Sequence, residues 1–294
     1  MKATATGPLN RRIFALEEEL EMHPLKRAEN EVWKTYGDRV SIIEKGKSLD
    51  KFGISLNADA GVRTTVALFQ GAVVNETFTT TNSIDSMVSD SASDTMAVVI
   101  EGHTIDGSGN LTFSVQTATL NGQTPVSLST PIARATRIYV ANSGIFGVYP
   151  AAAVGNVAVY DSTVATTAPG GTPSDATATK LMLASGSTQS EKCATATSSV
   201  DYWIINEVQA SVLSGSPNAR IEFDIERRDI VNGGAWRPFG LQLSLSTGEL
   251  PTQPAPMQNY VIIPPNHDVR MIARSQTNAS EVSAAMRGPL AIIT

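Results

Sequence analysis

Residues 219–227 read Ala-Arg-Ile-Glu-Phe-Asp-Ile-Glu-Arg, and this stretch decides the fold class. Ile221, Phe223 and Ile225 alternate with charged residues, so in an extended chain the apolar side chains share one face. An apolar face toward a core and a charged face toward water is typical of an antiparallel sheet. The stretch therefore predicts a β-strand at the surface of a β-rich domain.

Similar runs occur on both sides of this strand. They alternate or are rich in β-branched residues, and turn residues separate them. The predicted strands lie at 62–69, 95–101, 111–120, 134–141, 156–160, 202–212, 239–245, 259–263, 269–273 and 282–293. Asn121-Gly122 predicts a type I′ hairpin turn, Gly107-Ser108-Gly109 a hairpin turn, and Asn232-Gly233-Gly234 a turn between two strands. We expect a mainly β protein with two antiparallel β-sandwich domains of jelly-roll-like type, preceded by a short α-helical N-terminal segment.

Charge and composition divide the chain into four predicted parts. Nineteen of the first 52 residues are charged, against 31 of the remaining 242. The predicted parts are a charged helical N-terminal anchor at 1–52, a first β-sandwich at 53–162, a linker at 163–179 and a second, jelly-roll-like sandwich at 180–294. The linker is rich in Thr, Ala, Gly and Pro, which cannot build a core.

The N-terminal anchor contains two short stretches of helical periodicity. Asn10 is a plausible N-cap, and Pro24 and Gly37 end the two runs. Helices of about three turns are marginal alone and need a surface to pack on. They either lie on their own β-domain or insert between neighbouring subunits, and we favour the second. The proposed anchoring interface comprises Ile13, Phe14, Leu16, Leu20, Leu25, Val32, Trp33 and Tyr36.

Charge and cysteine content argue against several partner classes. A net charge of −6 does not attract nucleic acid or anionic lipid. No apolar run is long enough to span a membrane, and residues 1–30 carry charges where a signal peptide would be apolar. Cys193, the one cysteine, cannot form an internal disulfide and fits a reducing cytoplasm. We expect a protein made in a cytoplasm, without nucleic-acid or membrane partners.

The residues that could carry catalysis or bind metal follow no known pattern. The Asp85, Asp90 and Asp94 group is typical of a polar loop, and Glu222, Asp224 and Glu226 of a solvated strand face. His267 lies in a turn that enters a strand. We predict no catalytic residue, no metal site and no cofactor, and therefore a protein that is not an enzyme.

Short motifs in order resemble a known protein class. They include Val98-Val99-Ile100-Glu101-Gly102, Arg137-Ile138-Tyr139-Val140-Ala141-Asn142, Gly234-Ala235-Trp236-Arg237-Pro238-Phe239 and Ile262-Ile263-Pro264-Pro265. These stretches resemble the tandem β-sandwich domains of virion structural and accessory proteins of tailed bacteriophages, especially those of aquatic hosts. The resemblance spans about 53–294 and implies a component of the virion, assembled in the host cytoplasm, with no catalytic residues to transfer.

The leading hypothesis is therefore a non-enzymatic virion protein at the neck or tail, or on the capsid exterior as head fibre or decoration. Its expected partners are other virion proteins (portal, neck, tail or major capsid protein) and further copies of itself. The alternative is a carbohydrate-binding receptor module of a phage fibre, which predicts an exposed aromatic patch at Trp203 or Trp236. A polysaccharide-cleaving enzyme is a third hypothesis, and it requires two carboxylates facing each other in a cleft.

Overall fold

A computed structural model describes residues 42–58, 64–65, 78–142, 150–165, 170–214, 220–246, 255–276 and 280–293. Within these ranges the chain is mainly β, and every strand pairing is antiparallel. The predicted fold class is confirmed at this level. The expected N-terminal helices lie outside the described residues. No helix among the described residues has the length and apolar character needed to cross a membrane.

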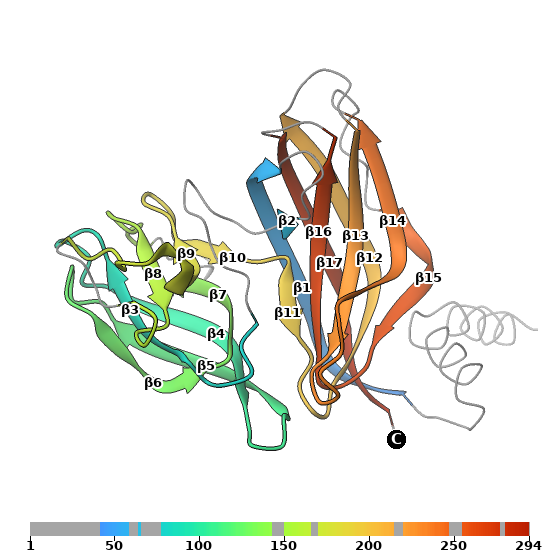
Figure 1. Cartoon of the computed structure of the whole chain (residues 1–294), viewed down its shortest axis with the longest axis horizontal. Helices are drawn as coiled ribbons and strands as arrows, with labels where there is room; N and C mark the ends of the chain where they lie inside the picture. The colour runs from blue at the N-terminus through green and yellow to red at the C-terminus, as the bar shows by residue number, and fades with distance from the viewer. Residues whose placement is uncertain are drawn as a thin grey trace, which may run out of the picture.

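The strands form two layered units, each with two sheets (Figure 1). The outer sandwich consists of β1 (Ile42–Ala58), β2 (Thr64–Thr65), β11 (Ala194–Ala196), β12 (Tyr202–Ser214), β13 (Arg220–Asp229), β14 (Arg237–Ser246), β15 (Ala255–Ile263), β16 (His267–Ser275) and β17 (Ser280–Ile293). The inserted sandwich consists of β3 (Ile84–Ser89), β4 (Ala97–Ile105), β5 (Leu111–Thr119), β6 (Val126–Ile132), β7 (Arg134–Val140), β8 (Val157–Tyr160), β9 (Thr179–Leu183) and β10 (Gln189–Glu191).

The outer sandwich pairs one sheet of order β1-β17-β12-β15 with a second of order β11-β16-β13-β14. Its core lies between them, where Ile221, Phe223 and Ile225 of β13 are buried with Trp203 of β12. The apolar face that the alternation predicts at 219–227 is therefore the face that packs inward. The indole of Trp203 also donates a hydrogen bond to the Gly288 carbonyl, at 3.2 Å.

The inserted sandwich pairs sheets of order β10-β7-β4-β5 and β6-β3-β8-β9. Its core is a separate cluster that includes Met87, Ile100, Ile138 and Leu181. Because each unit has its own core, each meets the main physical requirement for a domain.

The order of the strands places one sandwich inside the sequence of the other. β1 pairs along its length with β17, from Ile42 opposite Ile293 to Ala58 opposite Ser280. The chain then forms β2, passes through the whole inserted sandwich, and returns as β11. Both β2 and β11 pair with the same strand, β16, one after the other along it. Two separate strands, β2 and β11, therefore form this edge of the sheet, and the inserted sandwich comes between them in the sequence.

This arrangement differs from the four parts expected from the sequence. Residues 42–52, placed in the N-terminal anchor, belong to β1 and to the C-terminal sandwich. Most of the expected linker at 163–179 connects β8 to β9 within the inserted sandwich, and Ala165 and Ala178 are buried against Tyr160. The expected boundary at 180 also moves, because β9 and β10 still belong to the inserted sandwich.

The chain crosses between the sandwiches at residues 189–196. β10 ends at Glu191 and β11 begins at Ala194, so only Lys192 and Cys193 separate a strand of one unit from a strand of the other. The Lys192 N–H donates to the Thr136 carbonyl in the inserted sandwich, and the Cys193 carbonyl accepts from the Met271 N–H in the outer one. The crossing is hydrogen-bonded on both sides, which makes it an extended, ordered connection rather than a free linker.

The turn motifs have mixed outcomes. β4 and β5 form a hairpin around Gly107-Ser108-Gly109, and β13 and β14 are joined through Asn232-Gly233-Gly234, both as predicted. Asn121-Gly122 does form a tight turn, with Gly122 at φ 54°. However, the flanking strands β5 and β6 enter different sheets, so the expected hairpin there is wrong. The turn bends the chain from one layer to the other.

Candidate functional site

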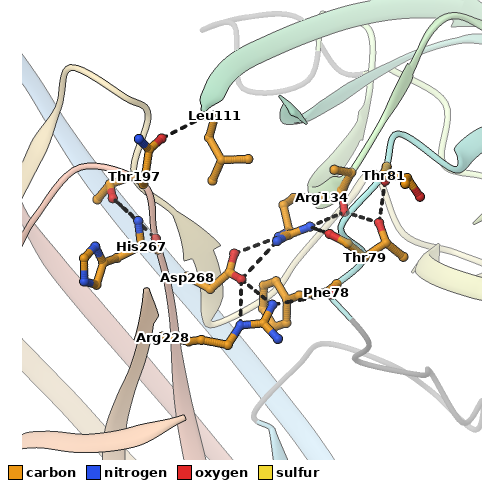
Figure 2. A network of polar contacts seen from close by, with 11 residues as sticks. Phe78, Thr79, Thr81, Leu111, Arg134, Thr197, Arg228, His267 and Asp268 are labelled. Carbon is orange, nitrogen blue, oxygen red and sulfur yellow. Dashed lines mark hydrogen bonds and ion pairs between the residues drawn. The ribbon is translucent and has the colours of Figure 1, made fainter. Parts of the chain in front are cut away.

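A buried ion pair joins the two sandwiches (Figure 2). Arg134 opens β7 of the inserted sandwich, and Asp268 lies at the start of β16 in the outer one. The guanidinium of Arg134 donates through Nε and Nη2 to the two carboxylate oxygens of Asp268, at 2.7 and 3.0 Å. The side chains are 2% and 0% exposed, so the contact is a desolvated two-pronged pair with the geometry that arginine and carboxylate favour.

Arg228 of β13 completes this cluster from the other side. Its Nη2 donates to Asp268 at 2.6 Å and to the Phe78 carbonyl at 3.4 Å. The guanidinium also lies over the rings of Phe78 and Trp236, at 5.7 and 5.1 Å from their centroids. Two cations therefore share one buried carboxylate, and both guanidinium groups lie over the Phe78 ring.

A second contact joins the β4–β5 hairpin to the outer sandwich. Asn266, at φ 54°, precedes β16 and directs its amide toward the hairpin. Its Oδ1 accepts from the Leu111 N–H at 2.9 Å, and its Nδ2 donates to Asn110 Oδ1 at 3.2 Å. The Leu111 carbonyl accepts from the Ser199 N–H at 2.8 Å. Both the N–H and the carbonyl of Leu111, a buried residue of the hairpin, thus form hydrogen bonds with the outer sandwich.

A cavity of about 460 Å³ lies at the boundary of the two sandwiches, beside the crossing. Its walls come from both sandwiches: Leu49, Asp50, Lys51, Thr195, Ala196, Thr197, Ser198, Asp201 and Leu290 of the outer one, and Glu101, His103, Phe113 and Arg137 of the inserted one. The volume falls within the range of about 300–1,000 Å³ that is usual for ligand pockets. Pockets at domain boundaries are a common location for binding sites.

Charged groups gather on one side of this cavity. Arg137 lies 3.7 Å from Glu101 and 3.5 Å from Glu191, and Glu191 also accepts from the Phe52 N–H at 2.8 Å. Burial lowers the pKa of the Lys51 ammonium, against the attraction of Glu191 and Glu101. Burial also raises the pKa of Glu191, although Lys51 opposes this shift. Shifted pKa values beside a cavity mark a candidate functional site.

His103 of β4 is the most unusual residue of the cavity. It is 4% exposed, and burial, with Lys51 and Arg134 nearby, lowers the pKa of its imidazole to about 3. The ring is therefore neutral at physiological pH. Its edge-on contact is with Phe113, at 5.4 Å between ring centroids. Its Nδ1 has no hydrogen-bond partner among the described residues.

Where the structure describes the candidate site residues that the sequence singled out, they do not line this cavity. The proposed anchoring interface, from Ile13 to Tyr36, lies outside the described residues. Asp94 accepts from the backbone of Val154 and Gly155, at 2.8 and 2.9 Å, and so holds a loop in place, as Asp85 and Asp90 do with Ser162 and Asn156. In the part of the chain that the structure describes, no three His, Cys, Asp or Glu side chains converge as metal ligands.

Two expectations about strand and aromatic surfaces need correction. Glu226 is not on a solvated face, because it is fully buried and paired with Arg270 at 2.9 Å. Trp203 is fully buried in the core and so cannot contribute to an exposed aromatic patch. Trp236 is half-buried against Arg228 and Arg270. His267 begins β16 after a turn, as predicted.

The sequence did not single out the interface residues Arg134, Asp268, His103 and Lys51. For Arg134 and Asp268 the useful signal was a charged residue inside or beside a predicted strand, where a charge is expensive unless it has a partner. No sequence pattern named those partners.

Comparisons with known proteins identified no relative of this chain. No protein-family model matches the chain, and neither a curated protein nor a solved structure gives a match.

Proposed function

We propose that this chain is a non-enzymatic structural protein of a bacteriophage virion, with a jelly roll as its outer sandwich. The observation that carries the proposal is the order of the strands. If β1, β2 and β12–β17 are renumbered 1 to 8 in chain order, the sheet β1-β17-β12-β15 has the order 1-8-3-6. The facing sheet, in which β2 pairs with β16 and is followed by β13 and β14, has the order 2-7-4-5. This is the strand order of a jelly roll, a fold that viral capsid proteins share with lectin domains and cupins.

The interface between the sandwiches supports a structural role. Arg134, Asp268 and Arg228 form a desolvated cluster, and the crossing at 189–196 is hydrogen-bonded to both units. Two domains joined by buried charges and an ordered strand hold one relative orientation, whereas domain contacts within a chain are commonly small and mobile. A fixed orientation suits a protein that must occupy one position in a repeated assembly.

The sequence resemblance supports the virion as the assembly. A jelly roll alone does not specify a function, because lectin domains and cupins use it too. The motifs that resemble tailed-phage virion proteins lie in both sandwiches, at 98–102 and 234–239 among others. We place the protein at the neck or tail or on the capsid exterior, with the charged N-terminal segment as its anchor.

The test is incorporation into particles. The full chain should be a stoichiometric component of purified particles by quantitative mass spectrometry. Deletion of residues 1–40 should abolish incorporation and leave a soluble protein with a β-type circular dichroism spectrum and cooperative unfolding. Normal incorporation of the truncated chain would disprove the anchor, and absence of the full chain from particles would disprove the virion role itself.

A further inference from the structure

We propose that Lys51 is a reactive amine that captures small aldehydes as an imine in the cavity between the two sandwiches. Lys51 belongs to β1, and its side chain forms part of the cavity wall. The proposal concerns the chemistry of this one residue and does not depend on the virion role. It assigns a class of covalent ligand to a cavity whose volume suits a small molecule.

The ammonium of Lys51 differs from those of two other lysines that the structure shows buried. Lys180 and Lys192 are each 5% exposed, and their ammonium groups donate to the backbone carbonyls of Thr177 and Lys180, respectively. Lys51 is 3% exposed, but its ammonium forms no hydrogen bond or ion pair with the described residues. It is also not one of the fully occluded side-chain atoms that lack a partner. Its nitrogen therefore has surface that opens to the cavity.

Arg137 holds the acidic groups that could otherwise pair with Lys51. It lies 3.7 Å from Glu101 and 3.5 Å from Glu191, and Glu191 also accepts from the Phe52 N–H at 2.8 Å. Burial lowers the pKa of Lys51 by more than the attraction of these carboxylates raises it, and Arg137 lowers this pKa further. A lysine with a lowered pKa has a larger neutral fraction, and the neutral amine is the nucleophile that forms Schiff bases.

An aldehyde is the ligand class that suits an amine in this setting. The neutral amine attacks the carbonyl carbon, a C–N bond forms, and the carbonyl oxygen leaves as water with the two protons of the amine. This condensation needs no oxidant, reductant or further co-reactant. The neutral imine carries no charge, so burial does not oppose its formation. Leu49, Phe113 and Leu290 in the cavity wall offer apolar contact for the carbon skeleton of the aldehyde.

The experiment compares the reaction rate of Lys51 with that of an unperturbed amine in the same tube. The full chain and the standard, Nα-acetyl-lysine methyl amide, are treated with dilute benzaldehyde and sodium cyanoborohydride, which reduces each imine to a stable amine. Peptide mass spectrometry then gives the rate at each lysine. At pH 7 about one unperturbed lysine in 2,500 is neutral. We expect Lys51 to react at least about tenfold faster than the standard, with a ratio that falls as the pH rises toward about 10.

Two variants and a second probe test where the reaction takes place. Lys51→Arg keeps the charge but has no nucleophilic amine, so it should lose the fast labelling. Lys192→Arg replaces a buried lysine that is not part of the cavity wall, and it should keep the fast labelling at Lys51. Oxidised dextran carries aldehydes on a polymer too large for the cavity, so it should modify the standard and spare Lys51.

Three results would overturn the proposal. The first is that Lys51 reacts no faster than the standard. The second is that the ratio of the two rates stays constant with pH. The third is that oxidised dextran modifies Lys51 as readily as benzaldehyde does, which would place the amine on the open surface. Because peptide mapping of the wild-type chain identifies the reactive lysine directly, these outcomes do not depend on the folding of either variant.

Discussion

The guanidinium of Arg134 and the carboxylate of Asp268 meet across the interface, although 134 residues separate them in sequence. Each residue belongs to a different sandwich with a different core, and neither charge has access to water. A buried ion pair contributes little net stability compared with an apolar pair, but breaking it leaves an uncompensated charge. From this asymmetry we expect the pair to help select the relative orientation of the two sandwiches.

Replacing one partner of this pair should be strongly destabilising. We expect Asp268→Asn to lower the free energy of unfolding by about 3–5 kcal/mol, because Arg134 and Arg228 lose their shared carboxylate. Urea unfolding followed by tryptophan fluorescence measures the change. Arg220→Met is the control, since Arg220 is exposed and lies 4.0 Å from Glu222, and it should cost less than about 1 kcal/mol. Equal effects of the two substitutions would refute the assigned role of the pair.

The stability of the protein should fall in mild acid because of His103. The pKa of its imidazole is about 3 in the folded protein and about 6.5 in the unfolded chain. The unfolded chain therefore binds a proton that the folded protein does not, and stability is lost as the pH falls from about 6.5 toward about 3. The contribution is on the order of a few kcal/mol.

Thermal unfolding across this pH range checks the effect. His103→Gln should flatten the dependence on pH, although it lowers stability at neutral pH. His267→Gln is the control, because its ring is only half-buried, and the acid slope should persist. A wild-type slope in His103→Gln would contradict the prediction.

Cys193 should report on opening of the interface. Its thiol is fully buried beside the Lys51 carbonyl, at 3.7 Å, and burial raises its pKa. A thiol reacts as the thiolate, so we expect no reaction with Ellman's reagent in the native protein and complete reaction in urea. Asp268→Asn should accelerate the native reaction by loosening the two sandwiches. Rapid stoichiometric labelling of the native wild type would show that the crossing is open.

Gly288 should tolerate no side chain. A Cβ built there would lie 1.8 Å from the Ile204 carbonyl oxygen, where β17 and β12 approach each other. We expect Gly288→Ala to cost about 3 kcal/mol or more, or to prevent folding, because backbone cannot move aside easily. Gly107→Ala is the control, since a Cβ there meets nothing within 4 Å, and it should change stability by less than about 1 kcal/mol. Soluble yield and urea midpoints measure both.

The local structure was largely predictable from the sequence. Alternation at Ile221, Phe223 and Ile225 identified a strand and its buried face, and the glycines at 107–109 and 233–234 identified two hairpin turns. Side-chain period and turn chemistry are properties of a few neighbouring residues, so a single sequence expresses them.

The long-range pairings were not predictable in this way. The charged residues in 42–52 favoured assignment to the anchor, whereas this stretch pairs with the last strand of the chain. Asn121-Gly122 correctly predicted a turn, but it did not indicate that β5 and β6 belong to different sheets. The residues of a turn do not specify which sheet the next strand joins. The ion pair of Arg134 with Asp268 and the walls of the cavity depend on the insertion of one sandwich in the other, and no local pattern encodes it.

The crossing at residues 189–196 also determines how the protein would respond to pulling. Because β10 and β11 follow each other with two residues between them, tension between the sandwiches would run along an already extended backbone. Hydrogen bonds in an antiparallel ladder lie perpendicular to the strands, so such tension would load the bonds of each strand together in shear rather than one at a time. A joint of this kind has almost no slack, and it would pass a displacement of one sandwich directly to the other.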